Sequence, residues 1–231
     1  DKEVKVRIKQ VKEQQPKVVK IKPKPISDKI EESLHYSNAE GAFFSASNNI
    51  TASYTTPFIL TYTQSSGVIG VLTSLQNLAS TLAVIPGAKL TSRIGSRKSI
   101  WVWSNIIQRF FWIPIILIPF LPISNPILII LMLFFMISFF AALRVPAWSS
   151  LMGDLVPKKT WGKYFGWRNV IMGTAGIIAI LVAGQILTFV GFSVLFTIAL
   201  ILGFISIYFF SKIYEPPFMR ELHYTHSISI Q

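Results

Sequence analysis

The sequence has no cysteine, and its 231 residues include only three histidines and only 10 Asp and Glu. Without cysteine, the chain can form no disulfide, no thiolate metal site and no cysteine nucleophile. The histidines stand apart at His35, His223 and His226, which leaves little for a zinc site. Charged residues amount to 14% of the chain, against about 25% in a typical soluble domain. These shortages argue against an ordinary soluble enzyme.

Catalytic motifs are missing as well. The sequence contains no P-loop, no paired metal-binding histidines and no Ser-centred nucleophile elbow. A membrane enzyme would need a nucleophile or a metal cluster at one depth, and we find none. We therefore predict a protein that is not an enzyme and uses no cofactor or metal. What the chain does have is 52% hydrophobic residues and a net charge of +12, which indicate a membrane protein with a basic cytoplasmic face.

The first 36 residues differ in composition from the rest. Residues 1–35 hold ten of the 22 Lys and Arg and no aromatic residue, so they cannot bury enough apolar surface to fold. We predict that residues 1–36 are a basic, disordered cytoplasmic tail. Two alternatives are a polybasic arm bound to anionic lipids and a short β-hairpin around Lys5–Lys9. Nucleic-acid binding is disfavoured because the segment has no aromatic side chain to stack on bases.

Long apolar stretches follow, separated by short breaks with turn residues. A membrane-spanning helix needs about 20 mainly apolar residues. The sequence therefore predicts an all-α membrane protein, with a six-transmembrane-helix bundle over residues 37–213 and a cytoplasmic linker or tail over residues 214–231. The six predicted spans are Gly41–Thr61, Val68–Leu90, Ile100–Leu121, Pro126–Trp148, Asn169–Val190 and Phe192–Ile213. Only Gly191 separates the last two.

Basic residues lie on one side of these spans. They occur in the tail, between the second and third spans, between the fourth and fifth, and after the sixth, whereas the three opposite loops carry none. By the positive-inside rule, both termini are expected in the cytoplasm.

Two loops carry motifs. The loop after the second span resembles the pattern G-x-x-L-[AS]-D-R-x-G-[RK]-[RK] of the major facilitator superfamily, and Ser92 replaces its acidic residue. A second stretch, Asp154 to Pro157 followed by Gly162 to Gly166, resembles the pattern D-x-x-P-x-x-x-x-G-x-x-x-G before the fifth span of that family. The residues that match in the first loop, with Asp154 from the second, are Gly87, Leu90, Arg93, Gly95, Arg97, Lys98 and Asp154. Because Ser92 replaces the acid, we expect another carboxylate to pair with Arg93. Asp154 is the nearest candidate, since the predicted topology places both residues on the same side of the membrane.

The resemblance covers about residues 37–213 and implies the amino-terminal half of a transporter. Such transporters have two six-helix halves and bind solute near the membrane midplane between them. The loop motifs, including Arg93–Lys98, would lie at the moving cytoplasmic surface. The resemblance also suggests a prokaryotic plasma membrane. No Asp or Glu lies in the middle of a predicted span, so a coupling carboxylate would reside in a missing half, or the protein is a facilitator.

Polar residues recur at helical spacing inside the first three spans. The candidate solute-binding residues are Asn48, Asn49, Gln76, Asn77 and Arg109. They predict either a wet cavity for a polar solute or hydrogen bonds between helices. Arg109 would meet an anionic substrate or a buried carboxylate, or would snorkel or be capped by amides and Trp112. Arg144 is expected to snorkel or to pair with Asp154 or Glu40.

Three functional hypotheses follow. The first is secondary transport of a small polar solute by alternating access. The second is a non-transporting membrane scaffold or partner subunit that works through its basic tail and anionic lipids. The third is a half-size transporter that acts as a homodimer, so that the missing half is a second copy.

Overall fold

The computed structural model describes residues 26–217, and throughout this range the chain is helical, with no strand. Six α-helices occur, with the 3-10 turns η1 (Ile118–Phe120) and η2 (Lys158–Thr160) between them. The α-helices are α2 (Ile26–Leu60), α3 (Ser66–Ile94), α4 (Arg97–Leu117), α5 (Ile127–Leu143), α6 (Val145–Leu155) and α7 (Trp161–Lys212). The all-α prediction is confirmed. The predicted disordered tail and hairpin, up to residue 25, lie outside the described residues, as do residues 218–231 of the predicted linker.

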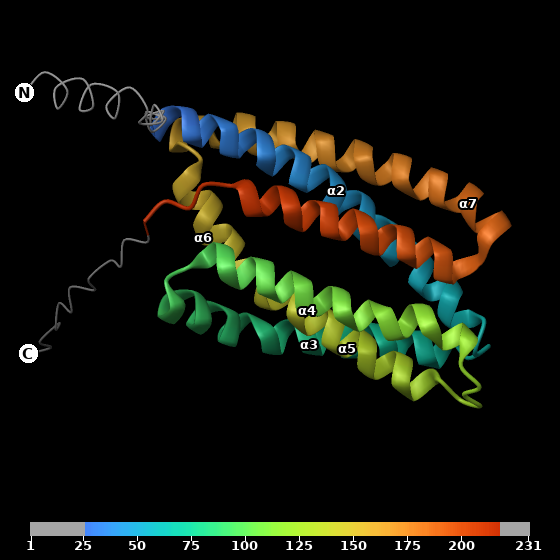
Figure 1. Ribbon diagram of the computed structural model, residues 1–231. Coiled ribbons are helices and arrows are strands. Elements are labelled where there is room, and N and C mark those ends of the chain that lie inside the picture. Colours follow the sequence, from blue (N-terminus) through green and yellow to red (C-terminus); the bar gives the residue numbers. More distant parts are fainter. Residues whose placement is uncertain (1–25, 218–231) are drawn as a thin grey trace, which may run out of the picture.

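Helix α7 reverses direction at Gly191. Its 52 residues would extend about 78 Å as one straight helix, far more than a membrane thickness. Gly191 has φ 75° and ψ 174°, a conformation that is open essentially only to glycine. Figure 1 shows the chain turning back on itself here. Two helical arms therefore meet at the residue where the sequence predicts a break between spans.

The helices pack as two groups that lie side by side. The first group is α2 with both arms of α7, and the second is α3, α4 and α5 (Figure 1). The most extensive contacts are those of α2 with α7 and of α3 with α5, and α4 joins the groups by packing on α7. Helix α6 continues from α5 at the end of the bundle where both described ends of the chain lie.

Four segments of the described chain are long and apolar enough to cross a membrane. They are Ser66–Ile94, Arg97–Phe120, Ile127–Leu155 and Lys158–Lys212, the last of which contains both arms of α7. Helix α2 is long enough but is not among them, because Ser, Thr, Asn and acidic residues lower its hydropathy. The chain thus has several membrane-crossing helices.

Two helix boundaries differ from the sequence prediction. Helix α2 begins at Ile26, so residues 26–36 continue the helix instead of belonging to the tail. Ile30 and Leu34, one helical turn apart, pack against an apolar cluster that includes Phe210, and this burial offsets the local charge. The predicted fourth span corresponds to α5 and α6, which are separated near Arg144 because Pro146 lacks the N–H for a continuous helix.

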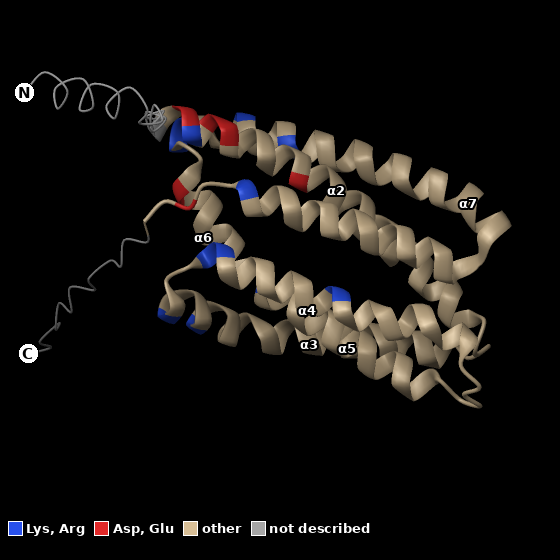
Figure 2. Cartoon of the chain, viewed as in Figure 1, with Lys and Arg blue, Asp and Glu red and all other residues tan. Residues whose placement is uncertain are grey.

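Charged residues are concentrated at one end of the bundle. Figure 2 shows the charged segments gathered at the end where both described termini lie, with one basic segment midway along α4. The loops at the other end, residues 61–65 and 121–126, carry no charge. One apolar cluster, around Phe58, Ile115 and Phe134, lies toward the uncharged end, and another, around Trp101 and Phe210, lies toward the charged end. The polar residues of the spans occupy the region between these clusters.

Candidate functional site

A cavity of about 150 Å³ lies between the two apolar clusters, enclosed by α2, α3, α4 and α5. We call it the central cavity. Its walls are half polar in character, with Phe44, Trp112 and Phe134 as aromatic neighbours. Its polar lining residues are Asn48, Thr51, Thr55, Gln76, Gln108, Arg109 and Ser138. Because polar groups in a membrane interior are costly unless they meet protein, water or solute, this cavity is a candidate binding site.

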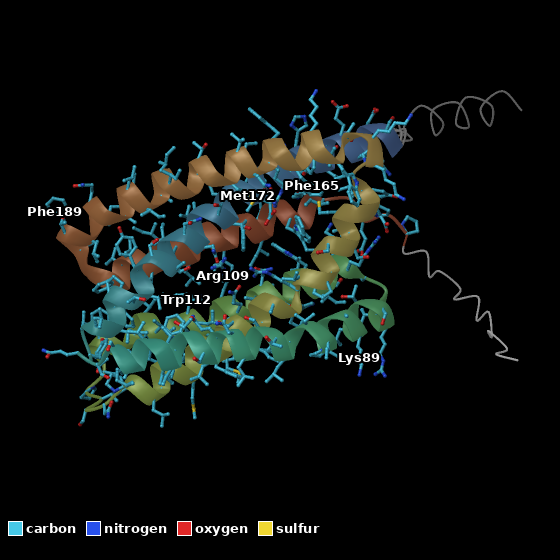
Figure 3. All side chains as sticks on the ribbon, turned by 180° about the vertical axis from the view of Figure 1, so that it is seen from behind. Lys89, Arg109, Trp112, Phe165, Met172 and Phe189 are labelled. Atoms are coloured by element: carbon cyan, nitrogen blue, oxygen red, sulfur yellow. The ribbon has the colours of Figure 1, made fainter. Side chains whose placement is uncertain are left out.

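Arg109 is held in the middle of the bundle. Its side chain is 3% exposed, and its Nη1 donates a hydrogen bond of 3.0 Å to the Ser47 hydroxyl of α2. Its Nε is buried without a hydrogen-bond partner in the described chain. The guanidinium lies against Gly203, where even a methyl group would overlap it. Arg109 therefore does not snorkel, and its partner is a hydroxyl, not the expected amides. Figure 3 shows it between the two helix groups, with Trp112 nearby.

A second cavity, of about 210 Å³, lies beside the first, toward the charged end. We call it the ion-pair cavity. Its lining residues are Glu40, Phe44, Trp101, Arg144, Val145, Trp148, Arg168 and Met172. Arg168 Nη2 donates to Glu40 Oε2 at 2.6 Å, and both side chains are almost wholly buried. The Ser206 hydroxyl also donates to Glu40, at 3.4 Å. This pair ties α2 to both arms of α7.

Arg144 projects into the bundle from the junction of α5 and α6. Its Nη1 donates to the side-chain oxygens of Asn105 and Gln108 on α4, the latter at 2.7 Å. Its guanidinium lies 5.0 Å from the ring centroid of Phe44 and 5.9 Å from that of Trp101. Arg144 does not snorkel, and within residues 26–217 it forms no direct ion pair with Asp154 or Glu40, although Glu40 is close enough to attract its charge. The side chain turns toward the α4 amides, whose oxygens both accept from Nη1.

The structure separates the five predicted binding residues. Asn48 and Gln76 line the central cavity with Arg109. Asn49 instead bonds to Ser45 and packs against Gly176 of α7. Asn77 is exposed and does not line this cavity.

Sequence reasoning missed other members of the lining. Thr51 and Thr55 lie three and seven residues after Asn48, so helical periodicity could have pointed to them. Gln108 directly precedes Arg109 on α4, and Ser138 is an isolated polar residue in an apolar run of α5.

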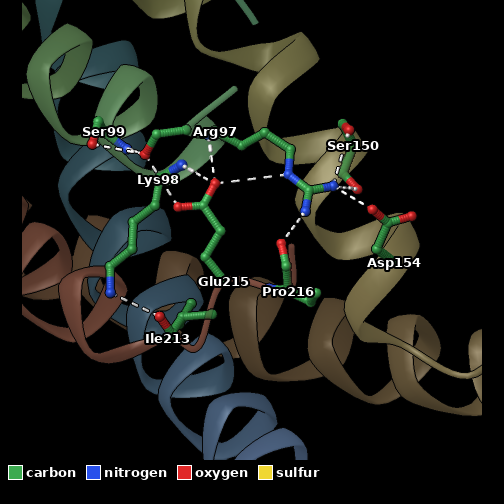
Figure 4. Close-up of polar contacts among 9 residues, drawn as sticks. Arg97, Lys98, Ser99, Ser150, Asp154, Ile213, Glu215 and Pro216 are labelled. Atoms are coloured by element: carbon green, nitrogen blue, oxygen red, sulfur yellow. Dashed lines mark hydrogen bonds and ion pairs between the residues drawn. The ribbon is translucent and has the colours of Figure 1, made fainter. Parts of the chain in front are cut away.

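Three of the motif residues, Arg97, Lys98 and Asp154, meet Ser150 and Glu215 at the charged end in a group that we call the end cluster (Figure 4). Arg97 is wholly buried and pairs with Asp154, and it also donates to the backbone oxygen of Pro216 at 2.9 Å. Glu215 accepts from the backbone N–H of Arg97 at 2.6 Å, and so places a carboxylate at the positive end of α4. Lys98 Nζ donates to the backbone oxygen of Ile213 at 2.8 Å.

Two features of the first motif determine these contacts. Gly87 packs directly on the backbone of Leu143, which leaves no room for a side chain. Gly95 has φ 73° and ends α3, two residues before α4 begins. The expectation that Asp154 serves Arg93 is wrong, because Arg93 lies on the exposed side of α3 and Asp154 pairs with Arg97. The sequence does not predict the contacts of Glu215, because residues 214–231 read as a linker or tail.

Apolar helices long enough to cross a membrane, packed around buried polar cavities, define a multi-pass integral membrane protein. The family model of the Major Facilitator Superfamily matches residues 41–223, and the chain belongs to this superfamily. It is therefore a membrane transport protein, from a family of transporters and not of enzymes. No curated protein matches the chain.

Proposed function

We propose that this chain is the amino-terminal half of a secondary transporter that moves a small polar solute by alternating access. The central cavity, together with the adjoining ion-pair cavity, would be its share of the binding site. The single observation that carries this proposal is a polar cavity at mid-depth, with Arg109 twelve residues, or about 18 Å, along α4 from Arg97. That depth is near the middle of a hydrocarbon core of about 30 Å.

The proposed membrane topology has six crossings. They are α2, α3, α4, α5 with α6, and the two arms of α7. The charged end would face the cytoplasm, because Lys and Arg gather there and the opposite loops carry none. Helix α2 crosses despite its low hydropathy because its polar side chains are covered by α7 or face a cavity.

The cavity is too small to be a complete site. Ligand pockets usually have about 300–1,000 Å³, whereas this one has about 150 Å³. Asn48 is also exposed at its edge. A second six-helix unit, either a carboxyl-terminal half or another copy, would complete the enclosure. Rocking of the two units would then expose the site to each side in turn.

Residues 1–231 contain no cysteine, so a single cysteine introduced among them allows a direct test in the complete protein as it occurs in its membrane. Asn48→Cys would be treated with a membrane-impermeant thiol reagent from each side. We expect labelling from both sides, because the central cavity opens to each in turn. Asn49→Cys is the matched control, since it packs against Gly176 and should label poorly. The unsubstituted protein provides the background.

Labelling of Asn48→Cys from one side only, under every condition, would contradict alternating access. Labelling from neither side would favour the scaffold hypothesis. If the native chain proves to be half-size, crosslinking of Asn48→Cys between copies would distinguish a homodimer from a pair of unlike halves.

A further inference from the structure

We infer that the transported solute is an organic anion with an apolar body, bound in the ion-pair cavity with its negative charge on Arg144. That the bound anion is transported rests on the proposed function, whereas its binding in this cavity does not. It follows from charge balance, from the donors of Arg144 and from the positions of the aromatic rings.

The two cavities have an excess of positive charge. Three arginines line them, Arg109, Arg144 and Arg168, against a single carboxylate, Glu40. Glu40 is hydrogen-bonded to Arg168 and so neutralises it. Neither Arg109 nor Arg144 forms an ion pair within the described part of the chain. An arginine remains charged in a protein, so two positive charges stay buried near mid-membrane without a contacting anion.

Arg144 has donors left for a ligand. Its two hydrogen bonds to Asn105 and Gln108 use Nη1 alone. Nε and Nη2 have no bond to residues 26–217, and they are not enclosed in the way that Arg109 Nε is. Because Arg144 lines the ion-pair cavity, these two nitrogens are the donors that it can offer to a ligand there. Two adjacent N–H groups of one guanidinium match the two oxygens of a carboxylate.

The arginines that lie on the aromatic rings exclude a cationic ligand. Rings around a cavity can by themselves bind a cation. Here the protein already supplies the cations, because Arg144 lies over Phe44 and Trp101, and Arg168 lies 5.1 Å from the Trp148 ring centroid. A second cation would be repelled by both guanidinium groups. The remaining ring surface, with Val145 and Met172, suits the apolar body of an anion.

Three matched probes test the charge preference. Benzoate, benzamide and benzylammonium share a ring and differ in charge. With the complete purified protein, we expect benzoate at about 100 times its Kd to raise Tm by roughly 5–10 °C, and the other two to have little effect. Arg144→Gln should abolish the benzoate shift, and Arg144→Lys should retain part of it. Arg93→Gln, at an exposed motif arginine, is the control that should retain all of it.

A second variant covers the case in which Arg144→Gln does not fold. Val145 lines the cavity beside Arg144, so Val145→Glu should fold, because the new acid can pair with Arg144. We expect it to remove the benzoate shift without changing the Tm of the ligand-free protein by more than a few degrees.

Several outcomes would overturn the inference. These are an equal shift from benzamide or benzylammonium, an equal shift from inorganic phosphate, a shift from anionic lipid vesicles only, or loss of the shift in Arg93→Gln. Failure of alternating access would be seen separately, as one-sided labelling of Asn48→Cys with the benzoate shift intact.

Discussion

Glu40 of α2 and Arg168 of α7 form an ion pair of 2.6 Å in which both side chains are almost wholly buried. A buried pair is sensitive to the loss of one partner, because the other charge is then left without compensation. Glu40 also accepts from Ser206 on the second arm of α7, so these contacts connect three helical segments.

Glu40→Gln should destabilise the protein by about 3–5 kcal/mol, because it leaves Arg168 charged and unpaired. Thermal unfolding in detergent would measure this loss. Glu31→Gln, which removes an exposed acid from the same helix, should change stability by less than about 0.5 kcal/mol. Arg168→Met added to Glu40→Gln should recover part of the stability, and failure to recover any would contradict the charge argument.

Gly203→Ala should be destabilising because its methyl group would overlap the guanidinium of Arg109. We expect a cost of about 1–3 kcal/mol from this overpacking. Gly173→Ala, also in α7 but with open space around it, should be neutral or stabilising by up to about 1 kcal/mol. Equilibrium unfolding of both variants gives the comparison. In a double-mutant cycle, Arg109→Ala should relieve most of the Gly203→Ala cost, and simple additivity of the two changes would refute the proposed overlap.

Gly87→Ala should cost more than Gly203→Ala, because its methyl group would meet backbone atoms of Leu143, which cannot rotate away. The expected loss is about 3 kcal/mol or more, with separation of α3 from α5. Gly70→Ala, in the same helix with open space around it, is the control. Thermal unfolding measures both, and equal behaviour of the two variants would show that close packing at Gly87 is unimportant.

Asp154→Asn and Glu215→Gln should act together, since both carboxylates contact Arg97. Asp154 is 54% exposed on its side chain, so solvent screens it and its single variant should cost only about 1 kcal/mol. The double variant should cost more than the sum, because it removes both carboxylates that contact this wholly buried arginine within residues 26–217. Denaturant titration of the four proteins in the cycle measures this coupling. Exact additivity would indicate that the two carboxylates act on Arg97 independently.

The sequence predicts helix content and helix ends better than it predicts which way a side chain points. The break at Gly191 could be predicted because an apolar run too long for one crossing contains a glycine there. Asn48 and Asn49 could not be distinguished in advance, because adjacent residues differ by about 100° and either could face the cavity. Only the packing of α7 against α2 decides that Asn49 turns away.

The partners of the arginines show a second limit. Arg93 and Arg97 are four residues apart, a spacing that would put them on one face of a continuous helix. Gly95, with φ 73°, ends α3 between them and assigns each arginine to a different helix. Asp154 therefore reaches Arg97 and not Arg93. A prediction from spacing fails where the backbone changes direction.

Phe44 is the one residue that lines both cavities. A substitution at any other lining residue resizes a single chamber, whereas a change at position 44 resizes both at once. Its ring thus works as the partition between a hydroxyl- and amide-rich compartment and an arginine-rich one. A shorter side chain would merge the two compartments into a single, longer chamber. Under the proposed function, the length of the solute would accordingly be set by a side chain with no polar atom.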